Sequence, residues 1–267
     1  MAHVLALSNQ KGGVGKTTTA VNLAASLAHL GMRVLLVDLD PQGNATSGLG
    51  HDVGETPMGV YDALMGFRDL AAVLQPTATP GLDLVPASAD LVGAEVELVD
   101  EDRREQRLRR ALNPVRDEYD FIVIDCPPSL GLLTLNALVA SDGVLVPLQA
   151  EYYAMEGLGA LLRTVQAVQR GLNPDLRREG ILITMSDARN RLCRDVEEQA
   201  RQVFQAEVFT TVIPRNVRLG EAPSHGRSIL DYDARSTGAQ AYAALGAELL
   251  ARHGITPRPP RPSQEAS

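Results

Sequence analysis

The sequence predicts an α/β fold, in which a mostly parallel, twisted sheet is flanked by helices on both faces. Short, β-rich apolar runs alternate with longer helical patterns almost from end to end. The runs are continuously apolar, which is typical of strands buried on both faces. Each run is followed by a helical pattern, so successive strands can lie parallel through crossover helices. No linker interrupts this alternation, and we therefore expect a single domain over residues 1–255.

The expected elements follow in order along the chain. Seven strands are predicted at residues 4–8, 34–38, 82–86, 121–125, 144–148, 181–185 and 208–213. Helices are predicted at residues 17–29, 59–65, 102–112, 132–139, 157–170, 194–204 and 237–252. Gly31 follows the first long helix, where a C-terminal cap belongs. Residues 256–267 are rich in Pro and Ser, which predicts a disordered tail.

Composition excludes several classes of protein. The apolar runs are too short to span a bilayer, and the N-terminus lacks the basic and then apolar pattern of a secretory signal. Cys126 and Cys193 provide no disulfide framework, and neither they nor the five scattered histidines show metal-binding spacing. A reducing cytoplasm is the expected compartment. The net charge of −8 argues against a protein that coats nucleic acid through positive charge, so DNA binding would have to be local or switched.

The distribution of lysine is informative. The chain has 25 basic residues, but its only lysines are Lys11 and Lys16. The chain uses arginine at every other position that carries a basic side chain. Both lysines lie in one six-residue stretch, which indicates a site that requires a compact ammonium group.

Residues 8–18 follow an expected strand and open an expected helix, which is the context of a phosphate-binding loop. Glycines let successive N–H groups point at a phosphate, and the positive end of the helix adds attraction. Lys16 is expected to contact the β- and γ-phosphates, and the Thr17 hydroxyl to bind Mg²⁺. The alternative is a flexible glycine-rich turn. A chance match to all six fixed positions of the motif is expected only about once in ten million starting positions. The expected nucleotide-binding residues here are Lys11, Gly12, Gly13, Val14, Gly15, Lys16, Thr17 and Thr18.

The strand expected at residues 121–125 (FIVID) ends in an acid, which is typical of a Walker B motif. Asp125 is therefore expected to hold Mg²⁺ through a water molecule. Taken alone, an acid at the end of a buried strand could equally be a cap or an ion-pair partner. The nearby phosphate loop favours the metal role.

The loop departs from the standard motif, because Gln10 replaces its first glycine and Lys11 is an additional lysine. This variant, KGGVGKTT, resembles the deviant Walker A signature of the ParA/MinD family of ATPases. The resemblance implies ATP and Mg²⁺ as cofactors. It also implies that Lys11 crosses a dimer interface and contacts the partner's nucleotide, where it would neutralise charge during phosphoryl transfer.

Residues 38–44 (DLDPQGN) match the second motif of that family. The resemblance implies that Asp40 positions or activates the attacking water, so that Lys11, Lys16 and Asp40 are the expected catalytic residues. Thr17, Asp40 and Asp125 are the expected metal-site residues. Pro127 and Pro128 resemble the second switch segment, and Cys126 between these motifs is expected to be a small packed residue.

The resemblance covers nearly the whole chain. Residues 149–157, 184–189, 213–218 and 221–226 look like the small chromosomal ParA type, often called Soj. Such proteins use ATP to segregate replicated DNA with ParB, which implies a ParB-like partner, non-specific double-stranded DNA and an ATP-dependent homodimer at the nucleoid. The chain starts almost directly with the first strand, so we expect no N-terminal DNA-reading domain.

The resemblance also indicates which residues contact the adenine base and which contact DNA. Pro214 and Asn216 are expected to line the base, because an Asn amide suits the adenine edge. The alternative is an ordinary Pro/Asn turn. Arg189 and Arg218 match positions of non-specific DNA contact, in a stretch from residue 177 to 227 with nine arginines and seven acids. A solvated arginine face is the alternative, and the further candidates for DNA contact are Arg191, Arg194, Arg215 and Arg227.

Three rival functions share parts of this pattern. A MinD-like membrane ATPase needs a C-terminal amphipathic helix, which RPPRPSQEAS cannot form. An iron–sulfur electron carrier needs cysteines placed to share a cluster, and the two present lack that setting. A nucleotide-dependent regulator, for example of replication initiation, would bind ATP and a partner without requiring turnover.

Overall fold

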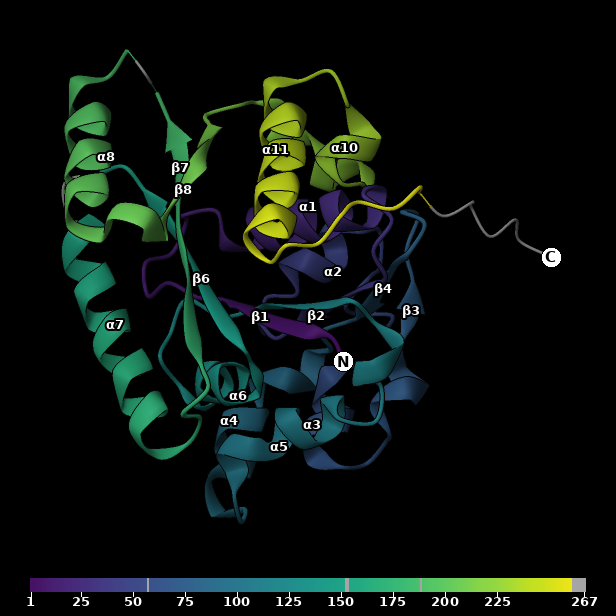
Figure 1. Cartoon of the computed structure of the whole chain (residues 1–267). Coiled ribbons are helices and arrows are strands. Elements are labelled where there is room, and N and C mark those ends of the chain that lie inside the picture. The colour runs from purple at the N-terminus through teal and green to yellow at the C-terminus, as the bar shows by residue number, and fades with distance from the viewer. Residues whose placement is uncertain (57, 152–153, 188, 261–267) are drawn as a thin grey trace.

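The computed structural model describes residues 1–56, 58–151, 154–187 and 189–260. Its strands form one eight-stranded sheet in the order β3-β4-β2-β5-β1-β6-β7-β8 (Figure 1). All neighbours pair in parallel except β3 and β4, which are antiparallel. The predicted α/β class is confirmed. The strands are β1 His3–Leu7, β2 Val34–Asp38, β3 Gln75–Pro76, β4 Leu82–Val85, β5 Phe121–Asp125, β6 Gly143–Gln149, β7 Arg177–Ser186 and β8 Val208–Pro214.

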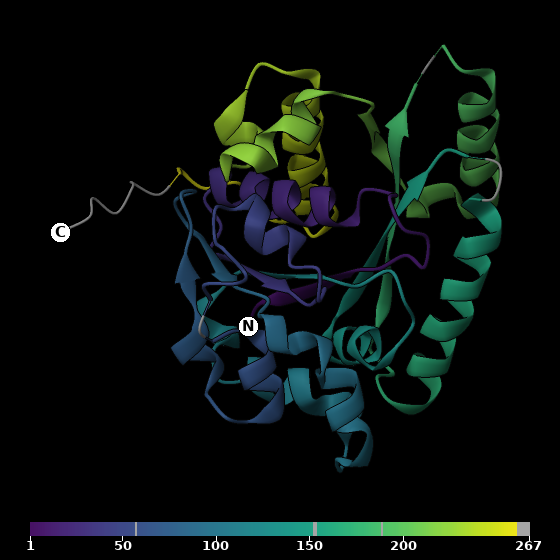
Figure 2. The same ribbon diagram turned by 180° about the vertical axis from the view of Figure 1, so that it is seen from behind.

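Helices cover both faces of the sheet (Figures 1 and 2). One face packs against α1, α10 and α11, and the other against α3, α5, α6, α7 and α8. The helices are α1 Lys16–His29, α2 Asn44–Gly48, α3 Val60–Met65, α4 Ala94–Glu97, α5 Arg107–Leu112, α6 Leu132–Ala140, α7 Ala154–Gly171, α8 Arg191–Phe204, α9 Arg218–Glu221, α10 Ile229–Tyr232 and α11 Thr237–Arg252.

The central strand β1 shows how the core is divided. Val4 and Ala6 pack in the cluster with α3 to α8, whereas Leu5 and Leu7 pack in the cluster with α1 and α11. Successive strand side chains point to opposite faces, so one apolar run supplies both layers. The continuously apolar pattern in the sequence has this origin.

All seven predicted strands are present, and the elements that the sequence did not predict are short. The edge strand β3 has two residues, one of them a proline, and α2, α9 and α10 have four or five. Segments of this length show no measurable periodicity. The helix predicted at residues 102–112 begins instead at Arg107, because Arg103 adopts a positive φ of 52° that interrupts the helical path.

Gly31 adopts the left-handed conformation, with φ 82°, just after α1, so the predicted cap is confirmed. A Cβ at this position would lie 2.4 Å from the carbonyl oxygen of Arg258. The backbone N–H of Arg258 donates to the Leu30 carbonyl at 2.9 Å, and its guanidinium lies 3.3 Å from Asp120. Arg258, within the predicted tail, is thus held against the domain. Residues 261–267 lie outside the described residues.

None of the helices in the described part of the chain combines the length and the apolar content that crossing a bilayer requires.

The sheet order brings the predicted motifs to one edge. In the paired register, Asp38 at the end of β2 lies opposite Asp125 at the end of β5, and Asp125 lies opposite Leu7 at the end of β1. The phosphate loop starts immediately after Leu7. The carboxyl edge of a parallel sheet is where such folds bind ligands, and the site is built there.

Candidate nucleotide-binding site

The loop between β1 and α1 is shaped by glycines. Gly13 and Gly15 have φ values of 74° and 83°, which ordinary L-residues rarely adopt. Gly12 has no such requirement, and a Cβ there would meet no atom within 4 Å. This open space suits the close approach of a ligand to the backbone. Thr184 attaches the loop to strand β7, because its hydroxyl donates to the Val14 carbonyl at 2.8 Å.

Lys16, the first residue of α1, is buried, with a relative exposure of 6%. Its Nζ donates to the Lys11 carbonyl at 3.2 Å, which holds the ammonium across the loop. Burial lowers the pKa of Lys16, and the nearby Asp125 carboxylate opposes that shift. The side chain is therefore positioned before any phosphate binds.

Asp125 is completely buried, and neither of its side-chain oxygens accepts a hydrogen bond of good geometry. Burial raises the pKa of this carboxyl group well above its usual range, and the negative charge of Asp38 adds to the rise. The neighbouring Thr17 hydroxyl and Lys16 ammonium oppose the rise. A buried carboxylate without partners is costly, so this position is suited to a bound cation.

Asp38, to which the sequence analysis assigned no role, lies beside Asp125. Its Oδ2 accepts hydrogen bonds from the backbone N–H and the hydroxyl of Thr46, both at 2.7 Å. Burial nevertheless raises the pKa of Asp38 to about 6. The sequence pattern that could have indicated Asp38 is its place as the acid that ends the second apolar run, just as Asp125 ends the run at residues 121–125.

Asp40 lines the cavity with 6% exposure, and its Oδ1 accepts from the Gln42 N–H at 3.0 Å. Asp40 and Asp125 act directly on the Lys16 ammonium and Asp38 lies beside Asp125, so three carboxyl groups accompany one buried lysine. Hard oxygen ligands and this excess of acid fit Mg²⁺. The Thr17 hydroxyl and Asp125 would hold the ion, with Asp40 at the cavity wall.

The cavity above the loop has a volume of about 490 Å³, within the range of small-molecule sites. Besides the loop and α1, four further segments close it, and the segment after β5 contributes Pro128. The segment after β2 contributes Gln42 and Asn44, the end of β7 contributes Met185, and the segment after α9 contributes Arg227. The lining residues are Gly12, Gly13, Gly15, Lys16, Thr17, Thr18, Val21, Asn22, Asp40, Gln42, Asn44, Ser47, Gly48, Pro128, Met185, Ala222, Pro223 and Arg227.

Lys11 does not line this cavity. Its Nζ lies 2.5 Å from Oε2 of Glu151, which follows β6, and both side chains are partly exposed. The Lys11 backbone N–H is fixed by Asn9 Oδ1 at 3.0 Å. The two lysines of the loop therefore differ: Lys16 is turned into the loop of its own chain, and Lys11 is held at its rim.

Comparisons with known proteins agree with this geometry. A family model described as "AAA domain" matches residues 2–178. A Myxococcus xanthus (strain DK1622) protein named "Chromosome partitioning protein ParA" is 56% identical over 98% of this chain and 92% of its own length. "Sporulation initiation inhibitor protein Soj" of Bacillus subtilis (strain 168) is 56% identical over 94% of this chain and 99% of its own length.

The chain belongs to the ParA/Soj family of chromosome-partitioning P-loop ATPases.

Solved structures show the same fold. "Cobyrinic Acid a,c-diamide synthase from Mycobacterium smegmatis with bound ADP and Magnesium" has a TM-score of 0.84 and 41% identity, covering 98% of this chain and all of its own. A putative plasmid partition protein from Borrelia burgdorferi B31 bound to AMPPNP has a TM-score of 0.80 and 25% identity, covering 95% of this chain and all of its own. Two relatives of the ParA/Soj fold have thus been crystallised with adenine nucleotides.

The two residues expected at the adenine do not line the cavity of this ParA/Soj relative. Pro214 ends β8, and Asn216 is half-buried just after it. The Asn216 amide already donates to Thr237 Oγ1 at 2.7 Å and accepts from the Arg218 N–H at 2.8 Å. Ala222, Pro223 and Arg227 line the cavity instead. Ala222 and Pro223 lie in the motif at residues 221–226, from which no nucleotide contact was predicted, and Arg227 was predicted only as a further candidate for DNA contact.

Arg189 and Arg218 follow the ends of two neighbouring strands, since Ser186 of β7 pairs with Pro214 of β8. The Arg189 side chain is 92% exposed and forms a two-pronged ion pair with Asp187, with both contacts at 3.1 Å. Arg218 lies 2.6 Å from Glu221. The structure therefore brings both arginines to one edge of the sheet, where each is paired with an exposed acid of its own chain.

Two of the motifs that resemble the ParA/Soj family extend into residues outside the described ones. Tyr152 and Tyr153 of the motif at residues 149–157, and Ala188 of the motif at residues 184–189, are in this group.

Proposed function

We propose that this protein is an Mg²⁺-dependent ATPase that partitions DNA in the cytoplasm. ATP drives two chains into a sandwich dimer, the dimer binds double-stranded DNA of the nucleoid non-specifically, and hydrolysis releases it. The observation that carries the proposal is 56% identity, over 98% of the chain, with a chromosome partitioning protein. The phosphate loop and the three carboxyl groups of the site support the enzymatic part.

In this mechanism each residue has a separate task. The loop amides and Lys16 bind the phosphates, and Thr17 and Asp125 hold the ion. Bound Mg²⁺ supplies positive charge that offsets the charge of the transferred phosphoryl group. Asp40, at the cavity wall, orients the attacking water through its carboxylate.

The position of Lys11 supports the dimer. Its ammonium lies at the rim, 2.5 Å from Glu151 and away from the cavity of its own chain. A second chain placed face to face would offer it a triphosphate in place of one carboxylate. The stronger charge of that anion favours exchange of partners. Dimerisation would then depend on ATP rather than ADP.

DNA binding by an acidic chain requires such a dimer. Nine arginines and seven acids between residues 177 and 227 leave a local charge of +2, whereas the chain has a net charge of −8. If each protomer supplies about two phosphate contacts, the dimer makes about four, and log affinity falls with log salt at a slope near −3.6. One chain alone has about half that slope and binds too weakly at physiological salt.

An acidic segment offers a surface for a ParB-like partner with a basic segment. Residues 89–102 contain six acids and no basic residue, and Val92, Val96 and Val99 are 69%, 75% and 51% exposed. Apolar side chains at this spacing among acids complement a basic amphipathic helix. Glu95 of this segment accepts a hydrogen bond from the Leu133 N–H at 3.3 Å, near the start of α6. Pro127 and Pro128 lie in the connection between Asp125 and this helix. Partner contact would thus reach the segment that follows Asp125.

Two measurements in one buffer test the proposal. Gel shifts with non-specific DNA should show binding with ATP and Mg²⁺ and none with ADP. Phosphate release should be slow for the protein alone and faster when DNA and the ParB-like protein are both present. Equal DNA binding with ADP and ATP contradicts the switch, and an absence of phosphate release under all conditions contradicts the ATPase.

A second candidate function is a nucleotide-dependent regulator. It is favoured by the name of the Bacillus subtilis relative, "Sporulation initiation inhibitor protein Soj". Such a role requires ATP binding and a partner, but not turnover. The variant Asp40→Ala separates the two, because it should stop partitioning and leave regulation intact.

A further inference from the structure

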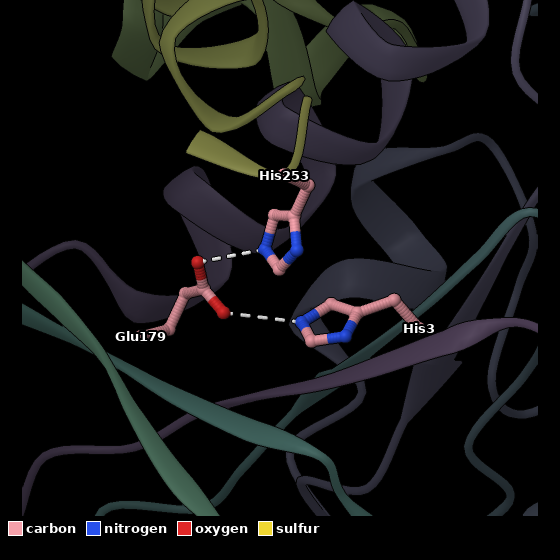
Figure 3. A group of neighbouring side chains, drawn as sticks. All are labelled: His3, Glu179 and His253. Atoms are coloured by element: carbon pink, nitrogen blue, oxygen red, sulfur yellow. Dashed lines mark hydrogen bonds and ion pairs between the residues drawn. The ribbon is translucent and has the colours of Figure 1, made fainter. Parts of the chain in front are cut away.

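Three side chains from distant parts of the chain meet at the edge of the sheet opposite the nucleotide site (Figure 3). His3 begins β1, Glu179 lies near the start of β7, and His253 follows the last residue of α11. Parallel strands start at the same edge, and the phosphate loop leaves the other end of β1. The cluster therefore belongs to no part of the ATP site.

The Glu179 carboxylate lies to one side of the two imidazole rings, with one oxygen directed at each ring, as Figure 3 shows. Its Oε1 is 2.9 Å from His253 Nε2, and its Oε2 is 3.1 Å from His3 Nε2. The ring centroids are 4.3 Å apart. Each Nε2 thus faces the carboxylate, and the three ligand atoms all lie within 4.8 Å of one another.

These separations fit a metal ion. Two ligand atoms that are each about 2.1 Å from one zinc ion lie roughly 3.0–3.4 Å apart. The two nitrogen–oxygen distances are already near that range. Small rotations of the imidazole rings would bring their nitrogens onto the same ion, without movement of the strands.

The surroundings of the cluster also resemble a metal site. His3 Nδ1 is 4.0 Å from Oδ2 of Asp142, which is too far for a hydrogen bond, although a small rotation of the ring would allow this second carboxylate to orient the histidine. Glu179 is 8% exposed, whereas His3 and His253 are 22% and 28% exposed, so water can reach the ligand atoms. Arg177, Arg252 and Arg116, which is paired with Asp142, are nearby cations that oppose a bound ion, and Glu179 and Asp142 are the acids that favour it.

The two histidines hold the Glu179 carboxyl group in its charged form. Burial alone would raise the pKa of Glu179, but hydrogen bonds from His253 and His3 outweigh that effect and lower it to about 2. The hydrogen bond to Glu179 raises the pKa of His253. Since a ligating imidazole must be neutral, a metal ion competes with a proton here and binds better as pH rises.

We propose that His3, Glu179 and His253 form a binding site for a divalent transition metal ion. Two imidazoles and one carboxylate, with water in the fourth position, match zinc best. The ion would connect the start of β1, the start of β7 and the end of α11. It would stabilise this edge of the domain without taking part in the chemistry of ATP.

The test uses the full-length, nucleotide-free protein. Zinc chloride is titrated in competition with a chromophoric chelator, and thermal unfolding is followed with and without zinc. We expect one zinc ion per chain with micromolar or tighter affinity, and a higher melting temperature with zinc. His253→Ala and Glu179→Gln should each weaken zinc binding at least tenfold and abolish the zinc-dependent rise in melting temperature.

Two controls separate this site from others. His51→Ala removes a histidine outside the cluster, and Asp125→Asn alters the nucleotide site, so both should bind zinc as the unchanged protein does. His3→Gln keeps a hydrogen-bond donor for Glu179, so it should fold and still lose zinc affinity. Zinc binding that is equally tight in His253→Ala and His3→Gln, or zinc binding lost in Asp125→Asn alone, would overturn the proposal.

Discussion

The Lys11 ammonium is held by the carboxylate of Glu151, with Nζ and Oε2 2.5 Å apart. Lys11 lies in the phosphate loop that follows β1, and Glu151 follows the neighbouring strand β6. In a single chain, the lysine expected to contact the partner's nucleotide is thus already occupied. In the proposed dimer, this ion pair would have to open.

Removal of that carboxylate should make dimerisation easier. The pair is partly exposed, and such pairs contribute roughly 0.2–1 kcal/mol. Glu151→Gln should therefore lower the ATP concentration for half-maximal dimerisation by about two- to fivefold, as measured by analytical ultracentrifugation. Glu118→Gln, an exposed acid near the opposite edge of the sheet, serves as the control. A higher ATP requirement in Glu151→Gln would show that Glu151 supports the dimer instead.

Asp40→Ala should separate ATP binding from turnover. Asp40 lines the cavity, but we propose that the loop and Lys16, not Asp40, bind the phosphates. We expect phosphate release to fall at least a hundredfold, in the range of a lost acid–base or water-positioning group. ATP affinity and the ATP-dependent dimer should persist, so that protein accumulates on DNA. Normal phosphate release from this variant would remove Asp40 from the catalytic residues.

The raised pKa of Asp38 predicts a specific pH dependence. The group is buried with a pKa of about 6, whereas the unfolded chain has its ordinary value near 3.8. The folded state therefore binds the proton more tightly, and the free energy of unfolding falls as pH rises from about 4 to about 6. The difference amounts to a few kcal/mol at most.

Asp38→Asn should remove that contribution in the nucleotide-free protein. The asparagine oxygen can still accept from Thr46, so the hydrogen bonds at 2.7 Å are retained. Urea unfolding at pH 4 and pH 7 should show that the variant gains stability relative to the unchanged protein at the higher pH. An equal difference at both pH values would mean that the Asp38 carboxyl group titrates normally.

Arg218→Glu should weaken DNA binding and leave ATP-driven dimerisation unchanged. The substitution places an acid beside Glu221 and Asp233, which Arg218 now contacts. If Arg218 makes one phosphate contact per chain, the dimer loses two, and the salt slope should change from near −3.6 to near −1.8. Arg68→Glu, at an exposed position after α3, is the matched charge control. The same loss in both variants would indicate a general charge effect.

Substitution of the exposed valines should reduce stimulation by the ParB-like partner. Val92→Ser together with Val96→Ser removes two side chains that are 69% and 75% exposed, so folding should be unaffected. Basal phosphate release should remain, and the partner's stimulation should fall at least threefold. Val203→Ser, at a position 58% exposed on α8, controls for loss of surface apolar area. Full stimulation of the double variant would place the docking surface elsewhere.

The central strands were predictable because the same residues satisfy both local and tertiary preferences. Val34–Asp38 and Phe121–Asp125 are apolar, β-rich and buried along their whole length. The phosphate loop was equally predictable, since its conformation depends on glycines at fixed places. Short segments such as Gln75–Pro76 were missed, because pairing with β4 rather than local preference forms that strand.

The sequence by itself determined the phosphate loop, because the conformation of that loop depends only on residues that are neighbours along the chain. Tertiary structure alone decided which distant groups meet. It set Asp38 opposite Asp125, placed Glu151 against Lys11, and brought Arg227 to the cavity. It also brought together His3 and His253, which are too far apart in the sequence to show a metal-binding spacing. Such contacts arise from strand order and helix packing, and no local pattern records them.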